Sequence, residues 1–122
     1  GFLKRTSGEW VYADSDGALV SGWVKDGGQW YYLDPASHVM ATGWVADRGS
    51  WYYLMGSGAM AIGWVNDGGT WYFLNASGKM ATGWVKDRGT WYYLAPSGAM
   101  LTGTQVINGR TYVFDANGVW VH

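Results

Sequence analysis

A repeat of about 20 residues limits what this chain can fold into more than any other feature. The segment GWVKDGGQWYYL starts at Gly22, and near-copies start at Gly43, Gly63 and Gly83, with a looser relative, GTQVINGRTYVF, at Gly103. The Gly-Trp tryptophans fall at positions 23, 44, 64 and 84, in steps of 21, 20 and 20 residues. A unit this short cannot bury an apolar face alone, so the copies must stack on one another.

Each copy has the pattern of a β-hairpin. In the first full copy, Trp23-Val24 leads into Asp26-Gly27-Gly28, and the chain returns as Trp30-Tyr31-Tyr32. Glycine supplies the positive φ angles that tight hairpin turns require, and tryptophan, tyrosine and valine favour strands. No stretch has the 3.6-residue periodicity of a useful helix. The sequence therefore predicts an all-β repeat protein in which stacked hairpins form a β-solenoid.

The unit boundaries follow from the repeat. We expect a single module over 1–122, with a divergent first unit (1–21), full repeats (22–42, 43–62, 63–82, 83–102) and a divergent capping unit (103–122). In the first unit Leu3 aligns with the Gly-Trp tryptophan and Phe2 lies beside it, so one ring of the pair is missing. The first connector is one residue longer than the others and places His38 where they have glycine, which predicts a local irregularity.

Composition excludes several classes of protein. A net charge of −1 gives no basic field for nucleic acid or anionic lipid, and no run of 18 apolar residues exists to insert into a membrane. The chain has no cysteine and two histidines, and its carboxylates do not form catalytic pairs, so we expect no enzyme activity, cofactor or metal. Because a repeat is cut at Gly1, we expect a fragment of a longer protein.

The aromatic side chains are the candidate functional groups, at 18% of residues. Alternation along a strand places Trp30 and Tyr32 on one face and Tyr31 on the other. These rings could simply form the solenoid core. However, Leu, Ile or Val would fill a core equally well, whereas tryptophan stands at two fixed places per unit and methionine recurs at 40, 60, 80 and 100. Electron-rich rings with a thioether and no hydrogen-bond donor suit a quaternary ammonium group.

The repeat GWVKDGGQWYYLDPASHVMATGW and its copies resemble the choline-binding repeats of pneumococcal and phage surface proteins, a cell-wall-binding repeat family. The resemblance covers nearly the whole chain. It implies a left-handed solenoid of hairpins that holds choline between successive hairpins. It also implies a secreted protein attached to the bacterial cell wall, with phosphocholine on teichoic and lipoteichoic acids as the ligand.

In that family each site uses two tryptophans of one repeat and a tyrosine of the next, often with a methionine. Carried over to this chain, the resemblance implies four boxes: Trp23, Trp30 and Tyr53 with Met40; Trp44, Trp51 and Phe73 with Met60; Trp64, Trp71 and Tyr93 with Met80; and Trp84, Trp91 and Phe114 with Met100. We expect a defective or absent site at Trp10, where the partner tryptophan is missing. Binding would then need two consecutive copies, as folding does.

Two other functions remain open at this stage. The last unit is similar to glucan-binding and clostridial-toxin repeats, which would make the chain a carbohydrate-binding array. Alternatively, the module is a structural spacer, or a homodimer formed through exposed rings of its terminal repeats.

The turn aspartates are expected to bond their own backbone or to add a negative field that favours a cation; they are Asp26, Asp47, Asp67 and Asp87.

Overall fold

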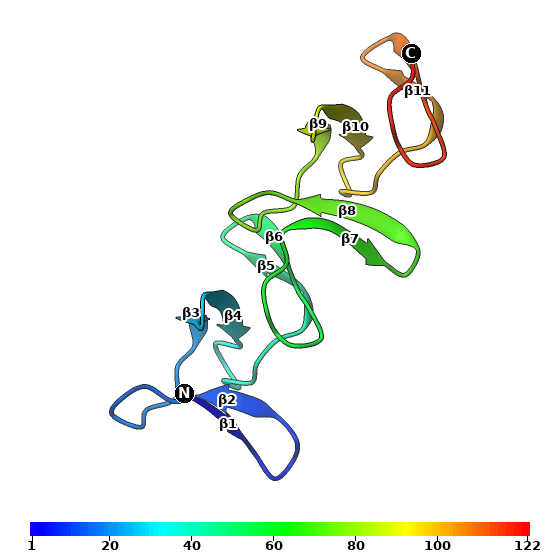
Figure 1. Cartoon of the computed structure of the whole chain (residues 1–122). Coiled ribbons are helices and arrows are strands. Elements are labelled where there is room, and N and C mark those ends of the chain that lie inside the picture. The colour runs from blue at the N-terminus through cyan, green and yellow to red at the C-terminus, as the bar shows by residue number, and fades with distance from the viewer. The chain divides into compact units, whose positions relative to one another are not determined.

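The computed structural model describes residues 1–122 and contains twelve strands and no helix (Figure 1). Each consecutive pair of strands forms its own antiparallel two-stranded sheet, which confirms the predicted all-β repeat of hairpins. The strands are β1 (Phe2–Lys4), β2 (Trp10–Tyr12), β3 (Gly22–Asp26), β4 (Gln29–Leu33), β5 (Gly43–Asp47), β6 (Ser50–Leu54), β7 (Gly63–Asp67), β8 (Thr70–Leu74), β9 (Gly83–Asp87), β10 (Thr90–Leu94), β11 (Gly103–Ile107) and β12 (Arg110–Phe114).

The chain divides into two compact units of three hairpins each. The first unit runs from Gly1 to Ala61 and contains β1 to β6, and the second runs from Ile62 to His122 and contains β7 to β12. No helix of the chain has the length and apolar character needed to cross a membrane.

Two-residue turns with positive φ close the full hairpins. Gly27 and Gly28 have φ angles of 59° and 83°, which match the right-handed twist of the flanking strands. In the second full copy the pair is Arg48 and Gly49, at 51° and 80°. An arginine therefore occupies the left-handed position that a glycine holds in the first full copy.

The connector between hairpins folds back onto the strand that precedes it. Met40 forms an isolated β-bridge with Leu33, and the other full repeats do the same with Leu54 and Met60, Leu74 and Met80, and Leu94 and Met100. In the first connector His38 has a φ of 63°, and its N–H bonds the carbonyl of Asp34 four residues back, so the predicted irregularity is confirmed as a wider turn.

An aspartate stabilises this wider turn. The Asp34 carboxylate accepts the backbone N–H groups of Ala36 and Ser37 at 2.8 and 2.9 Å. These bonds, from Ser37 first and then Ala36, hold the pKa of Asp34 below its ordinary value. Since the folded-state pKa is lowered, the stabilisation is present above the unfolded pKa of the carboxyl and is lost as pH falls through the folded one.

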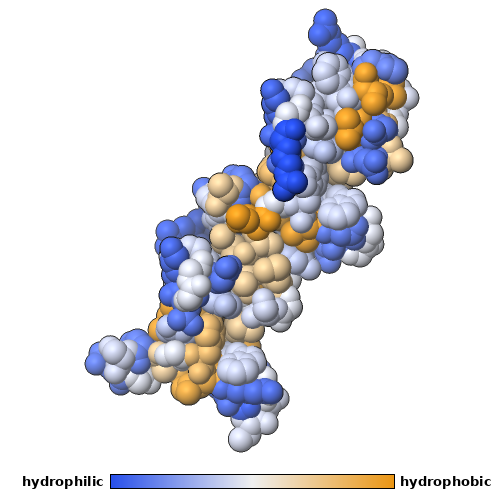
Figure 2. All heavy atoms as spheres, in the orientation of Figure 1, coloured by the Kyte–Doolittle hydropathy of each residue, from blue (hydrophilic) through white to orange (hydrophobic).

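The core is aliphatic and recurs once per repeat. The last residue of the second strand is a leucine that is at most 1% exposed in every full repeat: Leu33, Leu54, Leu74 and Leu94. Phe114 takes the equivalent place in the last hairpin and is 2% exposed. Many of the indole rings lie outside this core. Figure 2 shows residues of high hydropathy in patches on the visible face of the molecule.

Replacing one core leucine should destabilise the chain strongly. We expect Leu94→Ala to lower the free energy of unfolding by about 2–5 kcal/mol, because it removes buried methyl groups and leaves a cavity. The matched control is Val106→Ala in the same unit, where the valine is 71% exposed and the change should stay within about 0.5 kcal/mol. Denaturant unfolding followed by tryptophan fluorescence checks both, and equal effects would contradict the assigned core.

Candidate functional site: aromatic cages built from successive hairpins

The first-strand tryptophan of a repeat packs against rings from two hairpins. Trp23 meets Tyr32 of its own hairpin at a centroid distance of 4.9 Å and an angle of 65°, and Tyr52 of the next hairpin at 4.9 Å and 66°. In the second unit Trp64 lies in the same way between Phe73 at 4.9 Å and Tyr92 at 4.8 Å. Edge-to-face contacts of this kind stabilise by about 0.5–1.5 kcal/mol beyond the area that they bury.

A turn aspartate of the next hairpin fixes the same indole. The Trp23 Nε1–H donates to the Asp47 carboxylate at 3.0 Å, and Trp64 donates to Asp87 at 3.0 Å. Asp47 and Asp87 were expected to bond their own backbone or to add a negative field, and the structure instead gives each an indole partner in the previous hairpin. Burial raises the pKa of Tyr32 above its ordinary value, and the negative charges of Asp47 and Asp34 raise it further, against Arg48.

The second-strand tryptophans are much more accessible than the core. Their exposed fractions are 39–47% in the structure: Trp10, Trp30, Trp51, Trp71 and Trp91. A residue chosen only to fill the core would be buried, as the leucines are. These indoles are thus accessible from solvent, and a ligand can reach them.

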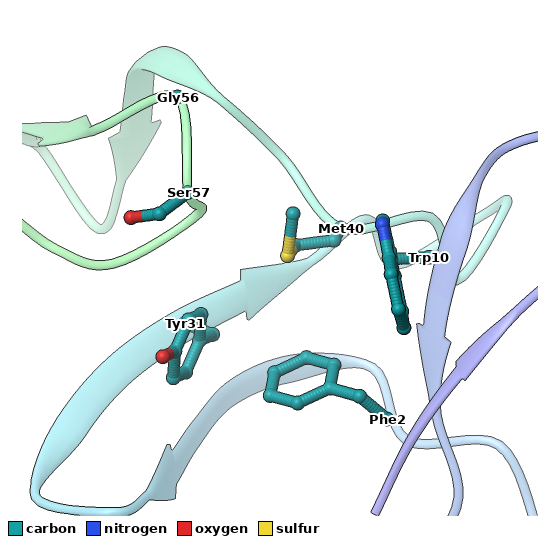
Figure 3. Close-up of a pocket in the computed structure, with 6 residues that line it drawn as sticks. All are labelled: Phe2, Trp10, Tyr31, Met40, Gly56 and Ser57. Carbon is teal, nitrogen blue, oxygen red and sulfur yellow. The ribbon is translucent and has the colours of Figure 1, made fainter.

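Three cavities are lined by such rings. The first, of about 370 Å³, is lined by Phe2, Trp10, Tyr31 and Met40 with Gly56 and Ser57, and we call it the N-terminal cage (Figure 3). The second, of about 290 Å³, is the central cage, lined by Trp64, Trp71, Tyr92 and Met100 with Ala116 and Asn117. The third, of about 340 Å³, is the C-terminal cage, lined by Trp84, Trp91, Tyr112 and Trp120.

Each cage takes its walls from successive repeats. In Figure 3 the rings of Phe2, Trp10 and Tyr31 surround a space that the Met40 side chain adjoins. The backbone N–H of Met40 bonds the carbonyl of Trp10, one hairpin earlier, at 2.8 Å. Gly58 stands beside this methionine, and a Cβ there would collide with the Met40 sulfur. The connector glycine therefore leaves room for the thioether wall.

The third ring of each cage differs from the one expected. The expected residues Tyr53, Phe73 and Tyr93 each pack on the first-strand tryptophan of their own hairpin. The ring that reaches the preceding hairpin stands one residue earlier, as with Tyr52 and Tyr92, because neighbouring strand residues point to opposite faces. Phe114, expected in the fourth box, is a core residue, and Tyr112 lines the cage instead.

The methionines are also displaced by one connector. Met40, expected beside Trp23 and Trp30, lines the N-terminal cage, and Met100, expected beside Trp84, lines the central cage. Met60 bonds the carbonyl of Trp30 at 2.8 Å, so it adjoins the Trp23 and Trp30 pair. The physical reason is the fold of the connector, which returns its methionine to the previous hairpin.

The two tryptophans of the second expected box lie in the first unit, and its third ring lies in the second. Trp44 packs on Tyr53 at 5.0 Å within its own hairpin, and Trp51 is 47% exposed. Phe73, which was expected with these two, lies in the other unit. Met80 lies against Gly98 within the second unit, where a Cβ would again collide with the sulfur.

A ring-lined cavity is present at Trp10, where a defective or absent site was expected. Strand register pairs Phe2 with Tyr12, as Trp23 pairs with Tyr32, so Phe2 rather than Leu3 holds the tryptophan position. Phe2 meets Tyr31 at 4.7 Å and 72°. Phenylalanine has no N–H to donate, and Asp26, at the position of Asp47, correspondingly has no indole partner.

Comparison with known families matches almost all of the first five units. A model described as a choline-binding repeat matches residues 1–40 and 61–102, and one described as a putative cell wall binding repeat matches residues 42–60. The chain belongs to the choline-binding repeat family. A comparison with curated protein sequences gave no significant match.

Solved structures of choline-binding repeat proteins are similar over the whole chain. Choline binding protein F from Streptococcus pneumoniae is 41% identical, with 99% of this chain and 41% of that chain covered and a TM-score of 0.91. The multimodular pneumococcal cell wall endolysin from phage Cp-1, complexed with choline, is 34% identical, with 99% and 36% covered and a TM-score of 0.70. The chain thus spans about two fifths of the length of these relatives.

A more distant structure carries a different ligand. Alternansucrase in complex with isomaltononaose is 25% identical, with 98% of this chain and 10% of that chain covered and a TM-score of 0.60. The choline-binding repeat fold is therefore shared with a protein solved with an oligosaccharide.

Three lysines of these choline-binding repeats lie over second-strand indoles. The ammonium groups of Lys4, Lys25 and Lys86 lie 5.9, 6.0 and 5.8 Å from the ring centroids of Trp10, Trp30 and Trp91. Each lysine is the cross-strand partner of its tryptophan. No group of three or more His, Asp or Glu side chains that could hold a metal ion is present.

The aspartate that holds the indole gives a testable prediction about stability. Asp47→Ala leaves the half-buried Trp23 N–H without its acceptor and should lower the free energy of unfolding by about 1–3 kcal/mol. Asp26→Ala is the matched control, because this aspartate has no indole partner and its loss should change stability by less than about 0.5 kcal/mol. Thermal unfolding measures both. A loss of equal size in the two variants would show that the aspartates act only in their turns.

Proposed function

We propose that this chain is a non-catalytic anchoring module that binds choline in aromatic cages between successive hairpins. The observation that carries the proposal is the cage itself, in which rings from two hairpins, with a methionine in two cages and a further tryptophan in the third, surround a cavity of about 290–370 Å³. The membership of the choline-binding repeat family and the likeness to an endolysin solved with choline support it.

A quaternary ammonium group fits this chemistry. It has no N–H to donate, so it loses no N–H hydrogen bond when no acceptor faces it. Its methyl groups fill the space between the rings. Its diffuse charge is attracted to each ring face by about 0.5–2 kcal/mol. A primary ammonium would give up its hydration without an acceptor to replace it.

The three lysine–indole pairs support the same chemistry from within the chain. In each pair an ammonium lies about 6 Å from the indole centroid, which is the distance over which a ring quadrupole attracts a cation. The second-strand tryptophans thus already serve as cation acceptors. A ligand cation in a cage would use the same type of ring face.

The proposal extends to the assembly and its location. The hairpins stack as a left-handed β-solenoid, and residues 1–122 form a single module of one divergent unit, four full repeats and a capping unit. The polymeric ligand is phosphocholine on teichoic and lipoteichoic acids, so the parent protein is secreted and attached to the cell surface. Several weak cages on one module gain avidity against a polymer that carries many cholines.

A carbohydrate-binding array is the second candidate, and two observations favour it. Alternansucrase was solved with isomaltononaose, and polar residues, Ser57 and Asn117, adjoin the N-terminal and central cages. Sugar hydroxyls need several such hydrogen-bonding groups beside a stacking ring. Apart from the polar atoms of the rings themselves, each of these cages offers one hydroxyl or amide side chain, so the cages suit choline better.

The ligand class is tested by competition. Millimolar choline should change the tryptophan fluorescence and elute the chain from a quaternary-amine resin, because the immobilised amine and free choline compete for the same cages. Glucose oligomers at the same concentration should do neither. Retention that free choline leaves unchanged would contradict the choline proposal, and elution by glucose oligomers alone would support the carbohydrate array.

The completeness of the N-terminal cage gives a prediction about stoichiometry. Trp10→Ala removes an exposed ring wall of this cage and should reduce the number of cholines bound per chain by one in a calorimetric titration. Leu19→Ala is the matched control, since Leu19 is also 39% exposed but lines none of the three cages. An unchanged stoichiometry in the Trp10 variant would show that this cage does not bind choline.

A further inference from the structure

The C-terminal cage has a tryptophan where the other cages have a methionine. Trp120 forms an isolated β-bridge with Phe114, as Met100 does with Leu94. Its backbone N–H donates to the carbonyl of Trp91 at 2.9 Å, and the backbone N–H of Met100 donates to the carbonyl of Trp71 at 2.8 Å. Trp120 is therefore the structural equivalent of the thioether wall and supplies a fourth ring.

The four rings stand at steep angles to one another. The centroid of Trp84 lies 6.2 Å from that of Trp91 at 87° and 6.2 Å from that of Trp120 at 77°. Tyr112 lies 5.0 Å from Trp84 at 72° and 6.4 Å from Trp120 at 64°. Only these four residues line the cavity, whereas connector residues such as Ser57 and Asn117 adjoin the other two cages.

The aspartate that holds the indole elsewhere is also missing here. Ile107 stands at the end of β11, where Asp47 and Asp87 stand in their own hairpins, and it is 8% exposed. The Trp84 N–H has no carboxylate acceptor. The charged group beside this cage is the Lys86 ammonium, 5.8 Å from the Trp91 centroid. The ring faces therefore supply the attraction for a cation here, against the positive charge of Lys86.

We propose that Trp120 makes the C-terminal cage more selective for a charged ligand than the methionine-walled cages. The inference rests on the proposed choline function and specifies how this cage distinguishes a charged ligand from a neutral one. A thioether contacts a trimethylammonium group and a neutral tert-butyl group through dispersion in much the same way. An indole face adds an attraction that only the charged group receives. The fourth ring therefore raises the preference for the cation over its neutral isostere.

The test compares choline with its uncharged carbon isostere, 3,3-dimethylbutan-1-ol. In ¹⁵N-labelled chain the indole resonance of Trp91 follows the C-terminal cage, and that of Trp71 follows the central cage. We expect Trp120→Met to lower the ratio of choline affinity to isostere affinity at Trp91 by about 2- to 10-fold. The affinity for the isostere should change little. Because Lys86 is retained, the comparison isolates the effect of the ring.

Two further variants test whether the ring itself causes the selectivity. Trp120→Phe retains a smaller ring and should give an intermediate ratio, so the prediction stands even if the methionine variant folds poorly. Met100→Trp should raise the same ratio at Trp71 in the central cage. Equal losses of affinity for both ligands in the Trp120→Met chain would overturn the inference, because Trp120 would then provide contact area alone.

The failure of this inference can be told apart from the failure of the proposed function. If choline shifts neither the Trp71 nor the Trp91 resonance of the unaltered chain, the choline function is wrong, and the inference falls with it. If choline shifts Trp71 but not Trp91, the function stands and the C-terminal cage is not a cation site. If the ratio of choline affinity to isostere affinity is the same at the two cages of the unaltered chain, the proposed role of Trp120 is overturned while the choline function stands.

Discussion

The edge-on packing of one indole between two phenyl or phenol rings is the interaction on which the rest of this structure depends. Trp23 touches Tyr32 of its own hairpin and Tyr52 of the next, and its N–H is held by Asp47 from that same next hairpin. A two-stranded hairpin is marginal by itself in water. This contact joins one hairpin to the next and covers ring surface that an isolated hairpin would leave exposed to water.

The same arrangement divides the tryptophans into two roles. The first-strand indole is packed from both sides and is needed for stacking. The second-strand indole, as at Trp30 or Trp71, remains about 40% exposed, while the leucine at the end of its strand is fully buried. Stacking therefore leaves an open ring beside the tyrosine of the next repeat. The cage is a consequence of how the hairpins are held together, which explains why the repeat keeps rings that an aliphatic core would not need.

Much of the fold could be predicted from the sequence, because glycine pairs and ring-rich strands have few alternatives. The hairpins and the unusual turn at His38 follow from local chemistry, whereas the buried leucine at the end of each second strand was not predicted. The third ring was placed wrongly at Tyr53, although strand alternation already separates it from Tyr52. The error came from choosing the residue by motif and not by the face it occupies.

Other parts of the site depend on contacts that local sequence does not show. The return of each connector to the previous hairpin decides which cage receives Met40, and it is visible only in the backbone bond to Trp10. The role of Asp47 required knowing which indole lies across from it. Trp120 was missed because the last unit is divergent, and its spacing from Phe114 was the only signal available.

A crystal structure of the chain grown with choline tests the central claim most directly. The account predicts density for a trimethylammonium group between hairpins, against the faces of Trp10 and Tyr31 in the N-terminal cage and against Trp91 and Trp120 in the C-terminal cage. Choline bound on other surfaces while the cages stay empty would contradict it.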